Sequence, residues 1–327
     1  MEVREVSAGE KPYRPVPIRL INWAGQGLDS LGVDLFQLSG DALMRKAVKQ
    51  TGLSDFGDDD FREGLERVVA SLRSEARLTL LGKVVAQGDL VGNLVARLQL
   101  VEWRKKHPEV ADEEIRAPLF INGLPRTGTS ILHGLLDVDP ANRSPLSWEV
   151  DTPVPPPRPE TWHSDPRIKA VDRKLASFCG LRPGLEAVHE LGASIPQECV
   201  VIMARNFRSQ QFATMFEIPS YVEWIDDASF TRTYQWHKQY LQHLQSGGVR
   251  GERWLLKSPC HLPLLDHIFE TYPDANIIHT HRDPIEVSTS VSSLFAMLRG
   301  ISSDHIDCRH IGRQQLDWWQ KLLGKAM

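Results

Sequence analysis

The pattern of apolar and polar positions changes about one third of the way along the chain. From residue 41 to about 103, the apolar positions recur at the spacing of an amphipathic helix. Four of them stand at i, i+3, i+4 and i+7: Leu65, Val68, Val69 and Leu72. This region is therefore predicted to form helices that each bury one face. Residues 1 to about 35 mix proline, glycine and apolar positions, which predicts an extended lead-in.

After residue 115, short apolar runs alternate with helical patterns. The run APLFING (117–123) predicts a strand, and TSILHGLLDVD, which begins at Thr129, predicts a helix. Farther along, four elements are predicted in alternation: strand 253–256, helix 262–271, strand 275–280 and helix 284–298. Strands that alternate with helices of about ten or more residues form βαβ units. The sequence therefore predicts an α/β fold with a parallel sheet.

The stretch between the first and second predicted strands is mostly helical in pattern. Residues 195–216 favour helix, and YQWHKQYLQHLQ (234–245) predicts a further helix with an exposed face of Gln, His and Lys. A Pro-rich run, TPVPPPRPE, begins at Thr152 and predicts a surface connection. The predicted organisation is a mainly helical region over 1–115 and an α/β core over 116–327.

Composition and charge narrow the class of protein. The chain has 327 residues and a mass of 37.0 kDa, with 41% hydrophobic and 24% charged residues, values typical of a soluble globular protein. A formal net charge of −4 gives no global basic field, so nucleic acid is not an expected partner. An anionic ligand would have to be held by a local site.

The sequence shows no targeting or membrane-spanning pattern. No apolar run is long enough to span a bilayer, and the charged amino terminus lacks the apolar core of a signal peptide. The four cysteines are scattered without a C-x-x-C pair, which argues against disulfide scaffolds and cysteine-rich zinc sites. A cytoplasmic location is expected, and peripheral contact with a membrane stays open.

The residues from Gly123 to Ser130 read GLPRTGTS and nearly match the phosphate-cradling pattern G-x-x-x-x-G-K-[ST]. In a strand–loop–helix unit, the N–H groups of the loop and of the first helical turn point outward together, and with the helix dipole they bind phosphate or sulfate. Glycine lets the backbone approach the anion closely. A tight turn with a hydroxyl cap is the alternative, but the complete spacing and Arg126 in the loop favour an anion site.

Thr129 stands where the phosphate-cradling pattern has its lysine. In nucleoside triphosphatases that lysine reaches the β- and γ-phosphates, and the following Ser or Thr holds Mg²⁺. Thr129 cannot replace the lysine, and no apolar strand ends in an acidic metal ligand. The strand in LLKSP ends in Lys257, and NIIHTHRD reaches Asp283 only after Arg282. A hydrolase of triphosphates is therefore disfavoured, and no metal site is expected.

Two further motifs supply candidate anion ligands. Arg282 directly follows a predicted strand, and Ser290 lies eight residues later, about two turns into the next helix. The bidentate fork of an arginine and a nearby hydroxyl could clamp a second phosphate. Lys257 ends the strand of WLLKSP, at the edge where open α/β sheets bind ligands. Taken alone, each motif is explained as well by solvated polar side chains.

Three segments, in this order, resemble the sulfotransferases that use 3′-phosphoadenosine 5′-phosphosulfate: PLFINGLPRTGTSILHGLL, RWLLKSPCHL and YPDANIIHTHRDPIEVSTSVSSL. They are similar to bacterial, notably actinobacterial, members and more distantly to tyrosylprotein sulfotransferases. The resemblance covers roughly residues 115 to 300 and implies a P-loop-type three-layer core with a parallel sheet. Family members commonly continue beyond the third motif into segments that help bind the adenosine, whereas this sequence ends at DWWQKLLGKAM.

The resemblance also implies roles for single residues. Arg126 takes the place of the family's catalytic Lys or Arg, and Lys257 that of the lysine that stabilises the bridging oxygen or the sulfuryl group. Arg282 and Ser290 match the pair that binds the 3′-phosphate. The implied donor-binding set is Pro125, Arg126, Thr127, Gly128, Thr129, Ser130, Arg282 and Ser290. Because this donor has no γ-phosphate and the family needs no Mg²⁺, the missing lysine is expendable and no metal is required.

The acceptor hydroxyl needs a general base. Tyrosylprotein sulfotransferases use a Glu after the loop helix, and the comparable segment here, RSPLSWEV, offers Glu149 in a register that differs by about two residues. The cytosolic branch uses a histidine, for which His189 is the candidate. An exposed carboxylate at the end of an element is the alternative interpretation of Glu149.

The expected activity is in-line transfer of a sulfuryl group to a hydroxyl of a small-molecule, lipid or glycan acceptor. Two alternatives stay open at this point. One is a small-molecule kinase that uses ATP and Mg²⁺, and the other is a non-catalytic nucleotide-binding protein of the same fold. The sequence determines neither the identity of the acceptor nor the oligomeric state.

Overall fold

The computed structural model describes residues 12, 14–31, 36, 38–188 and 190–326. Among these residues the sheet has four parallel strands in the order β2-β3-β1-β4. The strands are β1 (Leu119–Gly123), β2 (Asn142–Arg143), β3 (Arg253–Lys257) and β4 (Asn276–Thr280). The predicted α/β fold with a parallel sheet is confirmed.

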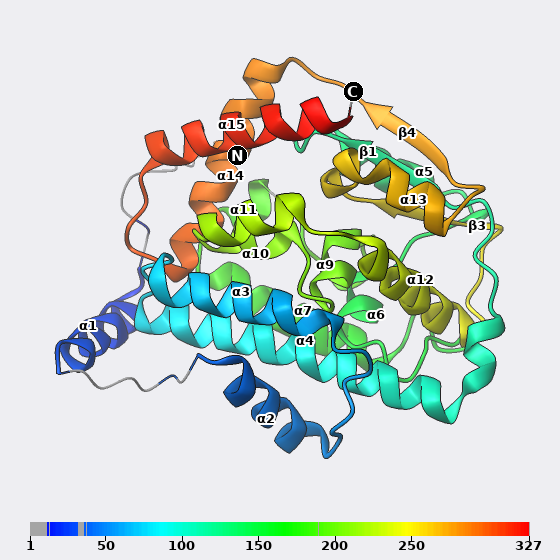
Figure 1. The fold of residues 1–327 in the computed structure, drawn as a ribbon, viewed down its shortest axis with the longest axis horizontal. Helices are drawn as coiled ribbons and strands as arrows, with labels where there is room; N and C mark the ends of the chain where they lie inside the picture. Colours follow the sequence, from blue (N-terminus) through cyan, green and yellow to red (C-terminus); the bar gives the residue numbers. More distant parts are fainter. Residues whose placement is uncertain (1–11, 13, 32–35, 37, 189, 327) are drawn as a thin grey trace.

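Helices form the larger part of the fold, and the sheet lies toward one side of it with β4 at the outer edge (Figure 1). In chain order the α-helices are α1 (Val16–Ser30), α2 (Gly40–Thr51), α3 (Asp60–Ser74), α4 (Leu80–Lys106), α5 (Thr129–Asp137), α6 (Ser147–Asp151), α7 (Pro166–Gly180), α8 (Leu185–Val188), α9 (Cys199–Ala204), α10 (Gln210–Met215), α11 (Pro219–Asp227), α12 (Thr231–Ser246), α13 (Leu265–Thr271), α14 (Pro284–Ser302) and α15 (Cys308–Ala326). Two 3₁₀ helices, η1 (Pro108–Asp112) and η2 (Pro259–Leu264), precede β1 and α13. Within the described ranges, no helix is long and apolar enough to cross a membrane.

The carboxyl ends of three strands meet because β1 lies between β3 and β4. All five residues of β1 are buried, as expected for a central strand with both faces covered. Ile121 pairs in register with Lys257, and Gly123 pairs with Thr280. Gly123 has a φ of 142°, and a Cβ atom there would lie 2.5 Å from Oγ1 of Thr280. Glycine is required at this position because the chain leaves β1 in close contact with β4.

The amino-terminal helices share one hydrophobic core with the rest of the chain. The predicted buried face of α3 is confirmed, because its four apolar residues are at most 3% exposed: Leu65, Val68, Val69 and Leu72. The same core cluster includes residues of α2, α4 and α9 to α12. Helix α3 approaches the central helices closely at Gly64, where a Cβ atom would lie 2.4 Å from the carbonyl oxygen of Phe207. Helices α2, α3 and α4 therefore pack directly on helices that follow β1 in the chain.

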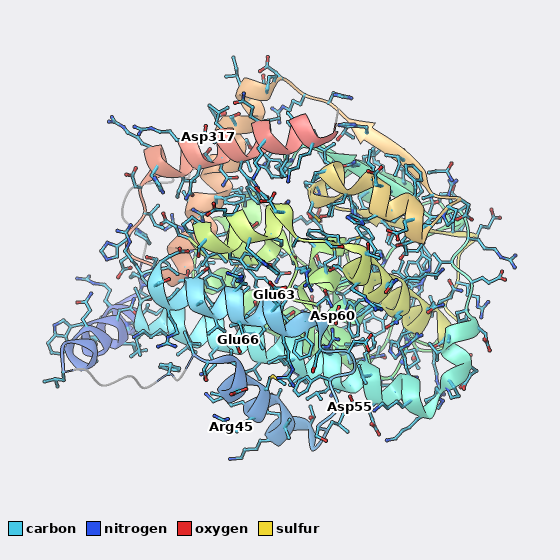
Figure 2. All side chains as sticks on the ribbon, in the orientation of Figure 1. Arg45, Asp55, Asp60, Glu63, Glu66 and Asp317 are labelled. Carbon is cyan, nitrogen blue, oxygen red and sulfur yellow. The ribbon has the colours of Figure 1, made fainter. Side chains whose placement is uncertain are left out.

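A buried arginine joins α4 to the start of α3. Arg97 is 2% exposed, and its guanidinium donates to the carbonyl oxygens of Phe56 at 2.8 Å and Asp58 at 2.9 Å. It also forms an ion pair of 3.3 Å with Asp60, which is labelled on α3 in Figure 2. Burial lowers the pKa of Arg97 to about 10, so the side chain stays charged at neutral pH. The three oxygens therefore compensate a charge inside the protein.

Two segments differ from the sequence prediction. The lead-in predicted to be extended contains helix α1, and the rest of that segment lies partly outside the described residues. Helix α1 forms because it can pack on α4 at Gly25 and through Asn22, whose Oδ1 accepts from the N–H of Leu81 at 3.2 Å. The predicted helical stretch 195–216 is divided into α9 and α10, with Phe207 in a left-handed conformation (φ 57°) between them.

Helix α12 buries part of the polar face that the sequence predicts to be exposed. His237 and His243 are completely buried. Nδ1 of His237 lies 2.8 Å from the hydroxyl of Tyr272, and Nε2 of His243 lies 2.8 Å from the carbonyl oxygen of Pro153. The prediction was wrong because a polar side chain with a hydrogen-bond partner can occupy a core position. Burial lowers the pKa of His237 to about 3 and that of His243 to about 4.

Candidate active site

A strand–loop–helix unit forms the centre of the candidate site. The chain leaves β1 at Gly123 and enters α5 at Thr129. Gly128 precedes α5 with a φ of 88°, and Arg126 has a φ of 68°. A left-handed conformation at a residue with a bulky side chain costs energy, and such strain is concentrated at functional sites. The N–H groups of the first turn of α5 face this loop, an arrangement that binds phosphate or sulfate.

Hydrogen bonds attach the loop to the edge of the sheet. Oγ1 of Thr127 donates to the carbonyl oxygen of Leu124 at 2.7 Å and lies 2.6 Å from Oγ1 of Thr280 in β4. Pro125, between Leu124 and Thr127 in the chain, is half-buried. These contacts hold the loop backbone in place before any ligand binds, which reduces the ordering cost of binding.

The side chain of a lysine in β3 reaches the first turn of α5, although the loop itself has no lysine. Lys257 is 3% exposed, and its Nζ donates to Oγ of Ser130 at 3.0 Å. The register of β1 against β3 explains this contact, since it places Lys257 beside Ile121, two residues before the loop. Thr129, which replaces the pattern's lysine in sequence, is 4% exposed and faces the interior. The ammonium group at the loop is therefore supplied by a neighbouring strand.

The same ammonium group contacts a carboxylate that the sequence analysis missed. Nζ of Lys257 forms an ion pair with Glu198, whose side chain is 20% exposed. Glu198 immediately precedes α9 and the apolar run CVVIMA. A single Glu before an apolar run is not a specific signal, so only the fold shows that it reaches Lys257. Ser130, Lys257 and Glu198 therefore form a connected polar group at the carboxyl edge of the sheet.

The two predicted arginines and the predicted serine also come together. Nε of Arg126 donates to Oγ of Ser290 at 3.0 Å, and Nη1 of Arg126 donates to the carbonyl oxygen of Val188 at 2.9 Å. Arg282 donates from Nη1 to the carbonyl oxygen of Arg126 at 3.1 Å and forms an ion pair of 2.6 Å with Glu286. Burial and the neighbouring Arg282 both lower the pKa of Arg126. The mutual repulsion of the two arginines favours binding of an anion near them.

The environment of Glu149 does not suit the predicted role of general base. Glu149 is 0% exposed, and both of its oxygens accept from Arg143 at 3.0 Å. The same carboxylate accepts from Nε1 of Trp162 at 2.6 Å and from the N–H of Leu146 at 2.9 Å. A carboxylate with four donors and no exposed surface is not placed to receive a proton from a substrate. His189, the other candidate, lies outside the described residues.

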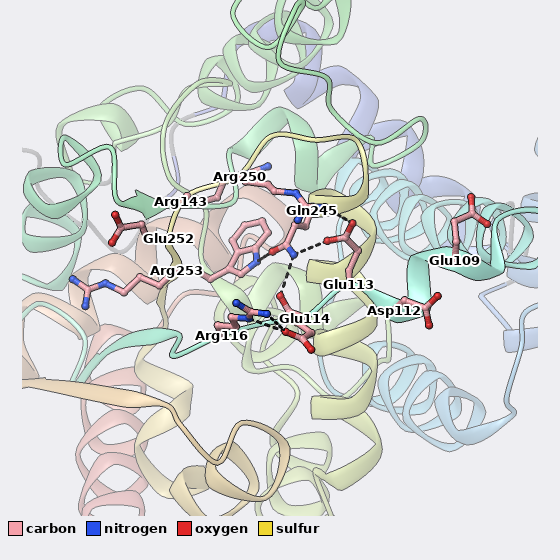
Figure 3. Close-up of a pocket in the computed structure, with 12 residues that line it drawn as sticks. Glu109, Asp112, Glu113, Glu114, Arg116, Arg143, Gln245, Arg250, Glu252 and Arg253 are labelled. Atoms are coloured by element: carbon pink, nitrogen blue, oxygen red, sulfur yellow. Dashed lines mark hydrogen bonds and ion pairs between the residues drawn. The ribbon is translucent and has the colours of Figure 1, made fainter.

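A cavity of about 540 Å³ lies away from this loop, at the opposite end of β3 (Figure 3). It opens beside Arg253, where β3 begins, whereas Lys257 stands at the end of the same strand. Its charged side chains largely bind one another: Arg250 pairs with Glu113 at 2.6 Å, and Nε2 of Gln245 donates to Glu113 at 2.7 Å. None of the predicted donor-binding residues lines this cavity.

Comparison with curated proteins finds two relatives with the same name. Both are omega-hydroxy-beta-dihydromenaquinone-9 sulfotransferase Stf3, one from Mycobacterium tuberculosis and one from Mycobacterium bovis. Each is 27% identical to this chain over 187 residues, a stretch that covers 55% of this chain and 46% of the relative. The match therefore spans less than half the length of these relatives.

Two solved structures resemble the whole fold more extensively. The crystal structure of sulfotransferase STF1 from Mycobacterium tuberculosis H37Rv has a TM-score of 0.80 and 34% identity, and the match covers 88% of this chain and 79% of that one. The crystal structure of sulfotransferase STF9 from Mycobacterium avium has a TM-score of 0.81 and 31% identity, with coverage of 88% and 74%. A model of the sulfotransferase family matches residues 118–327. The resemblance seen in the three sequence motifs is thus confirmed, and the chain belongs to the sulfotransferase family.

Proposed function

We propose that this chain transfers a sulfuryl group from 3′-phosphoadenosine 5′-phosphosulfate to a hydroxyl of a small-molecule, lipid or glycan acceptor. The observation that carries the proposal is the contact of 3.0 Å between Nζ of Lys257 and Oγ of Ser130. In nucleoside triphosphatases the corresponding hydroxyl holds Mg²⁺. Here a protein cation occupies that hydroxyl, which suits a donor whose reaction needs no metal.

The 5′ end of the donor would lie on the loop and the first turn of α5. The loop N–H groups and the dipole of α5 would bind the phosphosulfate, as they bind other anions at helix amino termini. Arg126 and Lys257 would stabilise the negative charge that develops on the leaving phosphate oxygen and on the sulfuryl oxygens. Donors that are fixed before the reaction stabilise such charge most strongly.

The 3′ end would lie on Arg282 and Ser290. In the structure these two residues have internal partners, because Ser290 accepts from Arg126 and Arg282 pairs with Glu286. A bound 3′-phosphate would replace these contacts and separate Arg126 from Ser290. Arg126 would then be available to the 5′-phosphosulfate, so binding at the two ends of the donor would be coupled.

The acceptor class follows only in part from the relatives. The name of Stf3 specifies a hydroxylated menaquinone derivative, which is a lipid. We therefore include a hydroxylated isoprenoid lipid among the acceptors to be tested, beside phenols and simple alcohols.

Adenosine 3′,5′-bisphosphate is expected to raise the melting temperature of the protein without added metal, and by more than AMP at the same concentration. A ligand at about 100 times its Kd stabilises the native state by about 2.7 kcal/mol. A thermal-shift series with the bisphosphate, AMP, ATP and ATP with Mg²⁺ tests this. Equal shifts with AMP and the bisphosphate would contradict a 3′-phosphate site, and a shift seen only with ATP and Mg²⁺ would favour a kinase.

Arg282→Ala is expected to weaken binding of the bisphosphate by about tenfold or more while changing AMP binding little. A charge-assisted contact to phosphate contributes about 1.5–3 kcal/mol, and about 1.4 kcal/mol corresponds to tenfold. Titration calorimetry with both ligands measures the difference. Arg250→Ala, which removes a paired arginine from the distant cavity, is the matched control. An equal loss for AMP and the bisphosphate would place Arg282 away from the 3′-phosphate.

A further inference from the structure

We propose that Glu198 is the general base that accepts the proton of the acceptor hydroxyl. This inference rests on the proposed function. It starts from one ammonium group, because Nζ of Lys257 contacts both Oγ of Ser130 and the carboxylate of Glu198. Ser130 belongs to the first turn of the anion-binding helix α5. The Lys257 side chain therefore connects Glu198 directly to Ser130, beside the position proposed for the transferring group.

Glu198 is accessible and held in position. Its side chain is 20% exposed, whereas Glu149 is 0% exposed. The N–H of Glu198 donates to Oε1 of Gln197 at 2.9 Å, and the N–H of Gln197 donates to the carbonyl oxygen of Pro145 at 2.8 Å. The residue that follows, Cys199, is completely buried. These contacts fix the backbone on both sides of Glu198, and a base must be fixed within hydrogen-bond reach of the proton it takes.

The charges at Lys257 explain why a carboxylate stands there. Lys257 is 3% exposed, and a buried ammonium group needs a counter-charge when no donor is bound. A bound phosphosulfate supplies a second counter-charge, which leaves the Glu198 carboxylate close to an anion. Uptake of a proton by Glu198 removes this repulsion. The ion pair therefore neutralises the charge of Lys257, and its carboxylate can accept a proton during the reaction.

In the proposed step, a proton moves to Glu198 and a sulfuryl group moves to the acceptor. The O–H bond of the acceptor breaks and its proton passes to a carboxylate oxygen of Glu198, while the acceptor oxygen forms a bond to sulfur. The bond between sulfur and the oxygen of the 5′-phosphate breaks, and its electron pair stays on that oxygen. Lys257 and Arg126 stabilise the new phosphate charge. The products are the sulfated acceptor, adenosine 3′,5′-bisphosphate and a protonated Glu198, which then releases its proton to water.

Other carboxylates near the loop have different partners. Glu286 pairs with Arg282 at the proposed 3′ end, and Oδ1 of Asp283 accepts from the N–H of Ile285 at 2.8 Å as the cap of α14. Among the described residues, Glu198 is the carboxylate paired with Lys257. The geometry therefore assigns the base by position as well as by accessibility.

The test compares acceptors that do and do not need a base. Phenols and aliphatic alcohols, including 4-nitrophenol and farnesol, are first screened with the unmodified protein. Glu198→Gln should lower kcat for an alcohol by about 10²–10⁴-fold, the usual contribution of a general base. At about pH 8, 4-nitrophenol is largely ionised and needs no base, so its kcat should fall by less than about tenfold. Glu198→Asp should retain a measurable rate with the alcohol and an acidic limb in its pH profile.

Several results would overturn the inference. An equal fall of kcat for both acceptors would show that Glu198 acts only by positioning Lys257, and an unchanged kcat for the alcohol would show that it has no role. Titration with the bisphosphate should give a Kd for Glu198→Gln no higher than that of the unmodified protein, because the variant removes a negative charge near the bound anion. Glu252→Gln, an exposed residue of the distant cavity, is the matched control. If the unmodified protein transfers sulfuryl to no acceptor in the screen, the proposed function fails and this inference fails with it.

Discussion

Lowering the pH from about 7.5 to about 5 is expected to reduce the free energy of unfolding by up to about 8 kcal/mol, which is comparable to the whole stability of a typical domain. Four buried histidines carry this expectation: His133, His237, His243 and His261. Burial lowers the pKa of His133 to about 4, that of His237 to about 3 and that of His243 to about 4. Burial and the neighbouring His237 also lower the pKa of His261.

The cause is the same at each histidine, because the folded protein holds the neutral ring. Nδ1 of His261 lies 2.6 Å from the hydroxyl of Tyr234, and Nε2 of His133 lies 3.0 Å from Oγ of Ser144. A proton on any of these rings would place a charge in the interior, and at His133 the ammonium group of Lys257 adds repulsion that Glu198 only partly offsets. The unfolded chain has no such penalty and takes up protons near the ordinary histidine pKa of 6.5. Below that value the unfolded state binds more protons, so stability falls as the pH falls.

The size of the expected loss of stability follows from the number of protons that the unfolded chain takes up on its histidines. At pH 5 each histidine loses about 2 kcal/mol, so four independent groups give about 8 kcal/mol. Burial raises the pKa of Asp89, and this carboxyl works in the opposite direction because the native state takes up a proton more readily there. A single group of opposite sign offsets only part of the loss. The four histidines together give a slope of at most about 5 kcal/mol per pH unit between pH 5 and 6, and Asp89 lowers the net slope below that value.

Urea unfolding at several values of pH measures this slope. His243→Gln keeps an amide donor for the carbonyl oxygen of Pro153 but cannot titrate, so it should lower the slope by about 1.4 kcal/mol per pH unit. Gln239→Ala, at an exposed position of α12 that does not titrate, is the matched control and should leave the slope unchanged. A stability that stays constant from pH 7 to 5 would show that the buried rings are charged in the native state or reach water.

Sequence patterns predicted the elements that depend on local order. The loop from Gly123 to Ser130, the strand ending at Lys257 and the helix after Arg282 follow from spacing within short segments, and the structure has them in the predicted places. The parallel sheet follows from their alternation. What the sequence could not supply is strand order and register. The contact between Lys257 and Ser130 requires β3 beside β1 in one register, and no local pattern encodes that pairing.

The errors at polar positions have the opposite origin, since each residue concerned has a distant partner. His237 and His243 look like solvent-facing residues of a helix until their partners, Tyr272 and Pro153, are known. Glu198 looks like an ordinary residue before a helix until Lys257 is seen beside it. Propensity and periodicity describe neighbours along the chain, whereas burial of polar groups is decided by tertiary contacts.

Glu149→Gln is expected to destabilise the protein by about 3–5 kcal/mol and to leave kcat and donor affinity nearly unchanged at temperatures where the variant stays folded. The reason is the charge of Arg143, which is 3% exposed and is held by both oxygens of Glu149. The N–H of Leu146 and Nε1 of Trp162 donate to different oxygens of Glu149, so the single amide oxygen of Gln can accept from only one of them. Gln also cannot neutralise the guanidinium. The indole rings of Trp254 and Trp162 lie 4.4 Å and 5.4 Å from that group and compensate only a small part of its charge.

A second substitution separates this loss from a catalytic effect. Adding Arg143→Met to Glu149→Gln removes the unpaired charge, so the double variant should recover a large part of the lost stability, as buried ion pairs replaced by apolar groups often do. Glu114→Gln, at an exposed carboxylate paired with Arg116, is the control for removing a surface charge and should change stability by less than about 1 kcal/mol. Unfolding in urea gives the stabilities, and initial rates with an accepted hydroxyl compound give kcat. If Glu149→Gln unfolds at the same urea concentration as the unmodified protein but loses about a hundredfold or more in kcat, Glu149 acts on the substrate, and the assignment of the base to Glu198 is wrong.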